Sequence, residues 1–324
     1  MPGEFEIINS YFAPSARPAP SVVLGVGDDC ALVVPPAEQH LAVSIDTLVE
    51  GVHFLEDISS EDLAWRLLGS SVSDLAAMGA EPLWLTLAIT LPKADEAWLA
   101  GFRLGLDQAL ERYRITLIGG DTCSGPVRVL TAQVQGSLPV GEALERRGAN
   151  PGDLIYVSGT LGDSRAGLEL LRNPDTQCEQ RDYLLNRFLR PTPRIELGLR
   201  LRGIASAAID ISDGLLADLG HLLERSEVGA QIELQSLPLS AALHAFRTEA
   251  QAQLWAATGG EDFELCFTVP AARKAEIEAL SAALGLRLTA IGQVVSGSEL
   301  QVRSAGEVWK SNAGAGFDHF GDLQ

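Results

Sequence analysis

The sequence predicts an α/β fold of two domains, in which helices pack on β-sheets as α+β layers. Three observations lead to this prediction. The chain has 324 residues, which is more than one hydrophobic core usually serves. β-rich runs alternate with amphipathic helical segments in both halves. Turn-forming residues crowd together between Arg146 and Asp153, so we expect domains at residues 1–147 and 148–324.

The first half should contain five strands and two helices. The first helix begins near Ser59, which stands in capping-box spacing with Asp62, and it ends at about Met78. The second helix runs from about Asp95 to Tyr113, and its apolar residues recur at helical spacing. Tyr113 belongs to this apolar face, so we expect it in the core. The expected strands are VVLGV, HLAVSID, LWLTLAITL, ITLIGG and VRVLTAQVQGSL.

The second half should repeat the alternation of strands and helices. We expect helices at about residues 168–171, 183–189, 214–226 and 273–284, and one that PTPR introduces with proline in its first turn. The expected strands are DLIYVSG, SAAIDI, QIEL, FELCFTV, LRLTAIG and ELQVRS.

Composition and charge exclude several classes of protein. Hydrophobic residues make up 46% of the chain, but no run reaches the ~20 apolar residues that a membrane span needs. The start, MPGEFEIINSYF, carries acids where a secretory signal carries basic residues, so we expect a cytoplasmic protein. The four cysteines form no C-x-x-C pair and predict reduced thiols. A formal charge of −19 disfavours nucleic acid and anionic membranes as partners.

Aspartates occur at the ends of apolar strands or in the glycine turns that follow them. These acids are Asp28, Asp29, Asp46, Asp121, Asp210 and Asp213. Asp74 lies in a helix, on the side of its apolar stripe. Each alone could be a cap or a turn residue. Together they would repel, since two carboxylates ~4 Å apart cost about 4 kcal/mol at an effective dielectric near 20. Convergence would therefore require bound Mg²⁺, Mn²⁺ or Ca²⁺.

The basic residues and the glycines bear on phosphate binding. Lysine occurs only at Lys93, Lys274 and Lys310, so bound phosphates would be neutralised mostly by divalent cations. The glycine pairs 119–120 and 259–260 either are plain turns or let backbone N–H groups approach a phosphate. No G-x-x-x-x-G-K-[ST] motif, protein-kinase signature or G-x-S-x-G elbow occurs, which excludes ATP binding by the standard phosphate loop.

A series of motifs resembles the thiamine-monophosphate kinases of the aminoimidazole ribonucleotide synthetase superfamily over essentially the whole chain. The motifs are GVGDDCALV, SIDTLVEGVHF, SDLAAMGAEP, LIGGDT, GDLIYVSGTLGDS, RPTPR, AIDISDGLLADLGHL, GGEDFELCFTV and GFDHF. The resemblance implies a homodimer in which the N-terminal sheets pair. It also implies transfer of phosphate from ATP to thiamine monophosphate, with several Mg²⁺ ions as cofactor.

The resemblance also assigns site residues. It implies metal positions at Asp29, Ser44, the Ile45 backbone, Asp46, Asp74, Asp121, Asp210 and Asp213. It implies ATP contacts at Gly120, Asp121, Arg146 and Ser212. It implies contacts to thiamine monophosphate at His53, Glu261 and Phe317.

The reaction implied is direct in-line transfer of the γ-phosphoryl group to an acceptor phosphate oxygen. That oxygen is already ionised at neutral pH, so we expect no general base, and catalysis by positioning and charge stabilisation. Two alternatives stay open. One is another ATP-dependent member of the superfamily, such as aminoimidazole ribonucleotide synthetase, and the other is a non-catalytic metal-binding scaffold.

Overall fold

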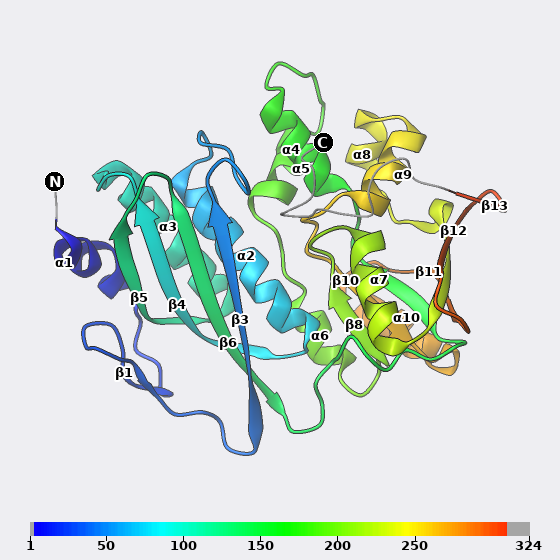
Figure 1. Cartoon of the computed structure of the whole chain (residues 1–324), viewed down its shortest axis with the longest axis horizontal. Helices are drawn as coiled ribbons and strands as arrows, with labels where there is room; N and C mark the ends of the chain where they lie inside the picture. Colours follow the sequence, from blue (N-terminus) through cyan, green and yellow to red (C-terminus); the bar gives the residue numbers. More distant parts are fainter. Residues whose placement is uncertain (1–2, 310–324) are drawn as a thin grey trace. The chain divides into compact units, whose positions relative to one another are not determined.

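The computed structural model describes residues 3–309, and the chain folds into two compact units, each with its own sheet (Figure 1). Unit 1 comprises Met1–Leu75 and Ala80–Gly141, and unit 2 comprises Ala76–Gly79 and Glu142–Gln324. The α/β class with two layered domains is thereby confirmed. Within the described residues, none of the helices combines the length and the apolar composition that crossing a membrane requires.

Unit 1 is built on a four-stranded sheet in the order β3-β6-β4-β5. Its strands are β3 (Gln39–Val49), β4 (Glu81–Leu91), β5 (Thr116–Ser124) and β6 (Val129–Pro139). β6 is antiparallel to both neighbours, whereas β4 and β5 are parallel and are joined through a helix. Short elements precede this sheet: α1 (Glu4–Ile7), η1 (Ile8–Phe12), η2 (Ala13–Ser15), β1 (Val22–Leu24) and β2 (Leu32–Val33).

Two long helices, α2 (Ser60–Ala77) and α3 (Glu96–Tyr113), lie on the same face of this sheet (Figure 1). The predicted capping box is confirmed, because the Ser59 hydroxyl accepts from the Asp62 backbone N–H at 3.1 Å and donates to its carboxylate at 2.7 Å. Tyr113 is buried in the core, as predicted, and its ring meets Trp65 edge-on at 5.8 Å.

The two faces of β3 differ in exposure. Successive side chains of a strand point to opposite faces, so Ser44 and Asp46 lie on the α2 side with the buried Leu48. The other face carries Leu41, Val43 and Ile45, which are 43%, 59% and 62% exposed. The open face of unit 1 is therefore apolar along this edge strand.

Unit 2 is built on a seven-stranded sheet in the order β13-β12-β9-β11-β7-β10-β8. Its strands are β7 (Leu154–Ser158), β8 (Ala207–Asp210), β9 (Gly229–Glu233), β10 (Leu265–Val269), β11 (Leu288–Val295), β12 (Leu300–Ser304) and β13 (Glu307–Val308). All neighbours are antiparallel except β9 and β12. Residues of β7 alternate between two cores, since Ile155 and Val157 belong to one cluster and Tyr156 to the other.

Helices cover both faces of the second sheet. The helices are α4 (Asp163–Arg172), α5 (Arg181–Leu189), α6 (Ile195–Leu201), α7 (Leu215–Ser226), α8 (Ala241–Phe246), α9 (Glu249–Thr258) and α10 (Lys274–Leu284), with 3₁₀ turns η3 (Leu234–Ser236) and η4 (Ala271–Arg273). Leucines of α7 fill one core, whereas α6 and α10 fill the other. A third cluster joins α4 and α5 to α8 and α9.

Two expectations from the sequence are wrong in detail. No element was assigned between Leu239 and Thr258, where α8 and α9 occur with Ser240 and Thr248 as N-caps. Gly119 and Gly120 do not form a turn, because β5 continues through them to Ser124. The irregularity lies just before them, where Ile118 has no partner in the register with β4.

Gly120 is required by strand packing. A Cβ atom built on Gly120 would overlap the Leu87 carbonyl oxygen of β4, whereas one built on Gly119 would meet nothing within 4 Å. We predict that Gly120→Ala lowers the free energy of unfolding by about 1–3 kcal/mol, as overpacking commonly does. The matched control Gly119→Ala should change it by less than about 0.5 kcal/mol. Urea denaturation of both variants tests this, and equal losses would contradict the steric explanation.

Candidate functional site

The central feature of unit 1 is a pair of carboxylates between β3 and α2. Asp46 on β3 and Asp74 on α2 are both half-buried, and the Ser44 hydroxyl donates a hydrogen bond to Asp74 Oδ2. The pKa of Asp46 is raised to about 6, first by burial and then by the negative charge of Asp74, while a hydrogen bond with the Ser71 hydroxyl opposes the shift. Two acids are thus held against each other where neither is fully hydrated.

The sequence explains this arrangement locally. The alternation of β3 turns Ser44 and Asp46 toward the helix, and the helical angle of Asp74 brings it to the apolar side of α2. Ile45, between them, points its side chain to the opposite, exposed face. Only the backbone of Ile45 is therefore near the acid pair, so its side chain is not available as a metal ligand there.

The other predicted acids of unit 1 lie apart from this pair. Asp121 is on β5, separated from β3 by three strand spacings, or roughly 14 Å. Its oxygens accept from the Thr122 N–H at 2.9 Å and from the Cys123 thiol at 3.1 Å. Asp29 is exposed in the connection between β1 and β2, next to Asp28. Within a single chain, Asp121 and Asp46 are therefore too far apart to coordinate the same ion directly.

The described part of the chain has no preformed cluster of metal ligands. Within residues 3–309, no group of three or more histidine, cysteine, aspartate or glutamate side chains lies close enough to hold a metal ion. Asp46, Asp74 and Ser44 nevertheless offer only oxygen atoms, which suit Mg²⁺. Mg²⁺ usually binds proteins through one or two carboxylates and completes its shell with water and substrate phosphates. The acid pair fits that mode of binding.

In unit 2, two loops meet at the ends of β8 and β10. Asp210 ends β8, and Ser212 and Asp213 follow in the turn before α7. The backbone N–H of Glu261 donates to the Ser212 carbonyl at 2.7 Å, so three predicted site residues, Ser212, Asp213 and Glu261, come from adjoining loops. The sequence motifs placed these residues about fifty positions apart.

A carboxylate that the sequence analysis missed organises the first of these loops. Asp218 Oδ2 accepts the backbone N–H groups of Ser212, Asp213 and Gly214, each at 3.0 Å. The pKa of Asp218 is raised to about 7, first by burial and then by the charge of Asp213, while the three N–H donors oppose the rise. The signal in the sequence is the spacing of Asp218 four residues after Gly214, where a first-turn acid can reach back to the loop.

The remaining predicted contacts are scattered over both units. His53 follows β3 in unit 1, and its Nδ1 accepts the Val49 N–H at 3.0 Å. Gly120 is exposed on β5. Arg146 is exposed in unit 2, where the Ser226 hydroxyl donates to its carbonyl at 3.0 Å. Phe317 lies outside the described residues.

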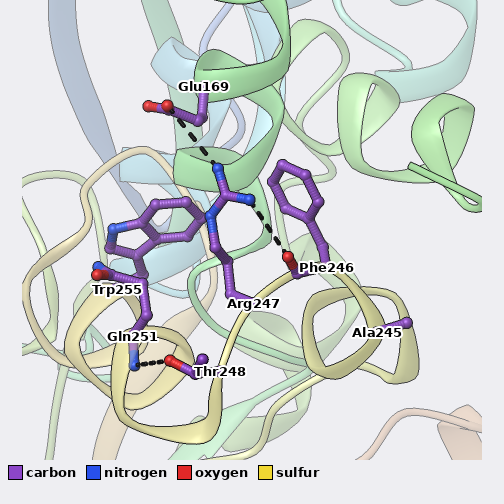
Figure 2. Close-up of a pocket in the computed structure, with 7 residues that line it drawn as sticks. All are labelled: Glu169, Ala245, Phe246, Arg247, Thr248, Gln251 and Trp255. Atoms are coloured by element: carbon purple, nitrogen blue, oxygen red, sulfur yellow. Dashed lines mark hydrogen bonds and ion pairs between the residues drawn. The ribbon is translucent and has the colours of Figure 1, made fainter. Parts of the chain in front are cut away.

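A hollow of about 520 Å³ in unit 2, drawn in Figure 2, contains none of the predicted site residues. Its cation, Arg247, is already engaged: the guanidinium lies 3.7 Å from the Phe246 ring centroid and 3.8 Å from a Glu169 oxygen. A second ring, that of Trp255, is 5.0 Å away. Because the arginine is already neutralised and stacked, we assign this hollow no part in the site.

Comparisons with known proteins agree with this two-unit architecture. The N-terminal domain of the AIR synthase related proteins matches residues 27–137, and the C-terminal domain of the same proteins matches residues 150–304. Thiamine-monophosphate kinase of Escherichia coli (strain K12) is 49% identical over 98% of both chains.

Two solved structures are similar throughout. Thiamine-monophosphate kinase from Stenotrophomonas maltophilia K279a has a TM-score of 0.86 and 42% identity, covering 94% of this chain and 97% of that one. A second structure, described as AaThiL complexed with AMPPCP and TMP, has a TM-score of 0.79 and 35% identity, covering 89% of each chain. The chain therefore belongs to the thiamine-monophosphate kinase family of the AIR synthase related proteins.

Proposed function

We propose that this protein transfers the γ-phosphoryl group of ATP to thiamine monophosphate, forming ADP and thiamine diphosphate. Thiamine-monophosphate kinases are similar to this chain over nearly its whole length, and one solved relative, AaThiL, is complexed with AMPPCP and TMP. The observation that carries the proposal in this structure is the half-buried pair of Asp46 and Asp74. Such a pair suits an enzyme that brings cations to two phosphorylated substrates.

We propose magnesium as the cofactor. Several Mg²⁺ ions would be bound, with ligands drawn from Asp29, Ser44, the Ile45 carbonyl, Asp46, Asp74, Asp121, Asp210 and Asp213. When bound, Mg²⁺ supplies positive charge that offsets the repulsion between donor and acceptor phosphates. The raised pKa of Asp46, caused first by burial and then by Asp74, supports this assignment because a cation would relieve both costs.

The protein's own residues would bind and orient the substrates. Gly120, Arg146 and Ser212 would contact ATP, and the Arg146 guanidinium would pair with phosphate oxygens. His53, Glu261 and Phe317 would contact thiamine monophosphate. The acceptor phosphate is ionised at neutral pH, so none of these side chains needs to remove a proton, and their contribution is in-line alignment of the reacting groups.

We also propose that two copies pair through the sheet of unit 1. The open face of β3 carries Leu41, Val43 and Ile45, all more than a third exposed. An apolar row on an edge strand is costly in water and is commonly covered by another sheet. This face is the best candidate for the homodimer interface that the family resemblance implies.

The phosphotransfer can be tested by phosphorus NMR of the protein with Mg²⁺-ATP and thiamine monophosphate. Thiamine diphosphate and ADP should form.

Asp74→Asn and Asp121→Asn should each lower turnover by at least about 100-fold while the fold is kept, because charge neutralisation at the phosphates is lost. The control Asp107→Asn, which removes a surface acid of α3 paired with Arg103, should keep normal turnover. Near-normal turnover in both site variants would contradict the metal assignment, and absence of ADP would favour a scaffold.

The acid pair also predicts a link between pH, Mg²⁺ and stability. The pKa of Asp46 is raised from 3.8 in the unfolded chain to about 6 in the folded protein. The folded state therefore holds this proton more tightly. The stabilisation that results is fully present below pH 4 and is lost as pH rises through 6. At pH 8 without Mg²⁺, Asp46→Asn should therefore raise the free energy of unfolding by up to about 3 kcal/mol. Wild-type protein should gain stability on addition of Mg²⁺, and the variant should gain much less. Thermal unfolding measures both, and a variant with an undiminished Mg²⁺ response would disprove the role of Asp46.

The dimer proposal predicts the effect of a charge on the exposed face of β3. Val43→Lys should raise the dimer dissociation constant by at least about 100-fold, because the lysine would be buried without a partner. Val140→Lys is a matched control, since Val140 is 60% exposed but follows the end of β6. Sedimentation equilibrium distinguishes the two variants. Equal dissociation constants for Val43→Lys and wild type would place the interface elsewhere.

A further inference from the structure

The segment from Gly259 to Glu264 connects α9 to β10 and contains Glu261, the predicted contact to the acceptor. Its backbone is hydrogen-bonded to the neighbouring loop at three points, one of which is the bond from the Ile211 N–H to the Glu264 carbonyl at 2.8 Å. The Glu261 N–H donates to the Ser212 carbonyl at 2.7 Å, and the Phe263 N–H donates to the Ile211 carbonyl at 2.9 Å. The segment is thus bonded to Ile211 and Ser212, which directly precede Asp213.

The backbone of this segment adopts an unusual conformation on both sides of Asp262. Glu261 has a φ of 69° and Phe263 a φ of 49°, so both non-glycine residues are left-handed. Residues with a side chain avoid this region, and they stay in it only where surrounding contacts hold them. Gly260 is constrained by packing instead, because a Cβ atom built on it would lie only 2.6 Å from the Ser212 carbonyl oxygen.

Asp262, between the two left-handed residues, is anchored to a different element. Its carboxylate accepts the Gly162 N–H at 2.6 Å and the Ser164 N–H at 3.1 Å, at the N-terminus of α4. The N-cap of α4 is Gly162, which has no side chain with which to satisfy these donors. Asp262 therefore supplies the cap from a position about a hundred residues away, and the helix N-terminus favours its negative charge.

The next acid fixes the end of the segment. Glu264 is fully buried and accepts hydrogen bonds from Arg194 Nε at 2.6 Å, from the Ser158 hydroxyl at 2.6 Å and from Arg187 at 3.0 Å. Arg187 also reaches the Asp262 carbonyl at 3.5 Å. Buried charges of this kind are stable only when every partner is present, so the segment has little freedom to move.

We propose that Asp262 is a positioning residue for acceptor binding. Its carboxylate, fixed on the N-terminus of α4, holds Glu261 in the left-handed conformation beside Ser212 and Asp213. Asp262 itself is 1% exposed, so its carboxylate is not available for direct contact with a substrate. This inference rests on the proposed function, in which Glu261 contacts thiamine monophosphate.

Hydrogen exchange measured by mass spectrometry tests the structural half of the proposal. Asp262→Ala should increase exchange in the peptide that contains residues 259–264, because the left-handed backbone loses its anchor. Asp262→Asn, which keeps the volume and one acceptor oxygen, should give a smaller increase. The matched control is Asp153→Ala: Asp153 is an equally buried acid of unit 2 that accepts from Asn150 and Ser206 and does not contact the segment.

Steady-state kinetics test the functional half. Asp262→Ala should raise the KM for thiamine monophosphate by about 10-fold to 100-fold, as misplacement of a binding group does, and change the KM for ATP by less than about twofold. In the background of Glu261→Ala the same substitution should add little, because Asp262 acts through Glu261. Asp153→Ala should leave the KM for thiamine monophosphate unchanged.

Three results would overturn the proposal: unchanged exchange in residues 259–264, independent effects of Asp262→Ala and Glu261→Ala, or an equal rise of KM in Asp153→Ala. Failure of the proposed function gives a different outcome. If wild-type protein forms no thiamine diphosphate, the assignment of the substrate falls. Hydrogen exchange then still decides whether Asp262 holds the segment.

Discussion

The close approach of two carboxylates between β3 and α2 is the interaction on which the account of this protein depends. Alternation along the strand and the helical angle of Asp74 force the approach, and burial prevents water from screening it fully. A folded chain tolerates such a pair when something outside the chain offsets its charge. Under the proposed function, a bound cation would offset the charge of this pair and also the repulsion between the phosphates of donor and acceptor.

Unit 2 uses carboxylates in a different way, as anchors for backbone. Asp218 gathers three consecutive N–H groups of one loop, and Asp262 caps a helix that belongs to another part of the chain. Both acids are buried, and burial raises the pKa of each to about 7. Hydrogen bonds from backbone N–H groups partly offset the cost of burying the two carboxylates. The same bonds hold the loops that contain Ser212, Asp213 and Glu261. Rigid loops of this kind suit a reaction in which alignment replaces acid–base catalysis.

Much of the fold follows from local rules. Caps and periodicity in the sequence located α2 and α3, and alternation or apolar runs located most strands. Local rules failed where spatial neighbours decide: Gly119 and Gly120 suggest a turn, but pairing with β4 extends the strand through them. The same limit applies to the site. Asp46, Asp74 and Ser44 were predicted as metal positions only through the resemblance to a family, whereas Asp262 could not be found because its partners, Gly162 and Ser164, lie far away in the chain.

The most direct test of the central claim is the titration of Asp46, followed by carbon NMR of its carboxyl group with and without Mg²⁺. Without Mg²⁺, the pKa should be about 6, well above the ordinary 3.8 of an aspartate, because burial and Asp74 both disfavour the charged form. Addition of Mg²⁺ should lower it by at least about one unit, since the cation favours the carboxylate. A pKa near the ordinary value that does not respond to Mg²⁺ would contradict the account.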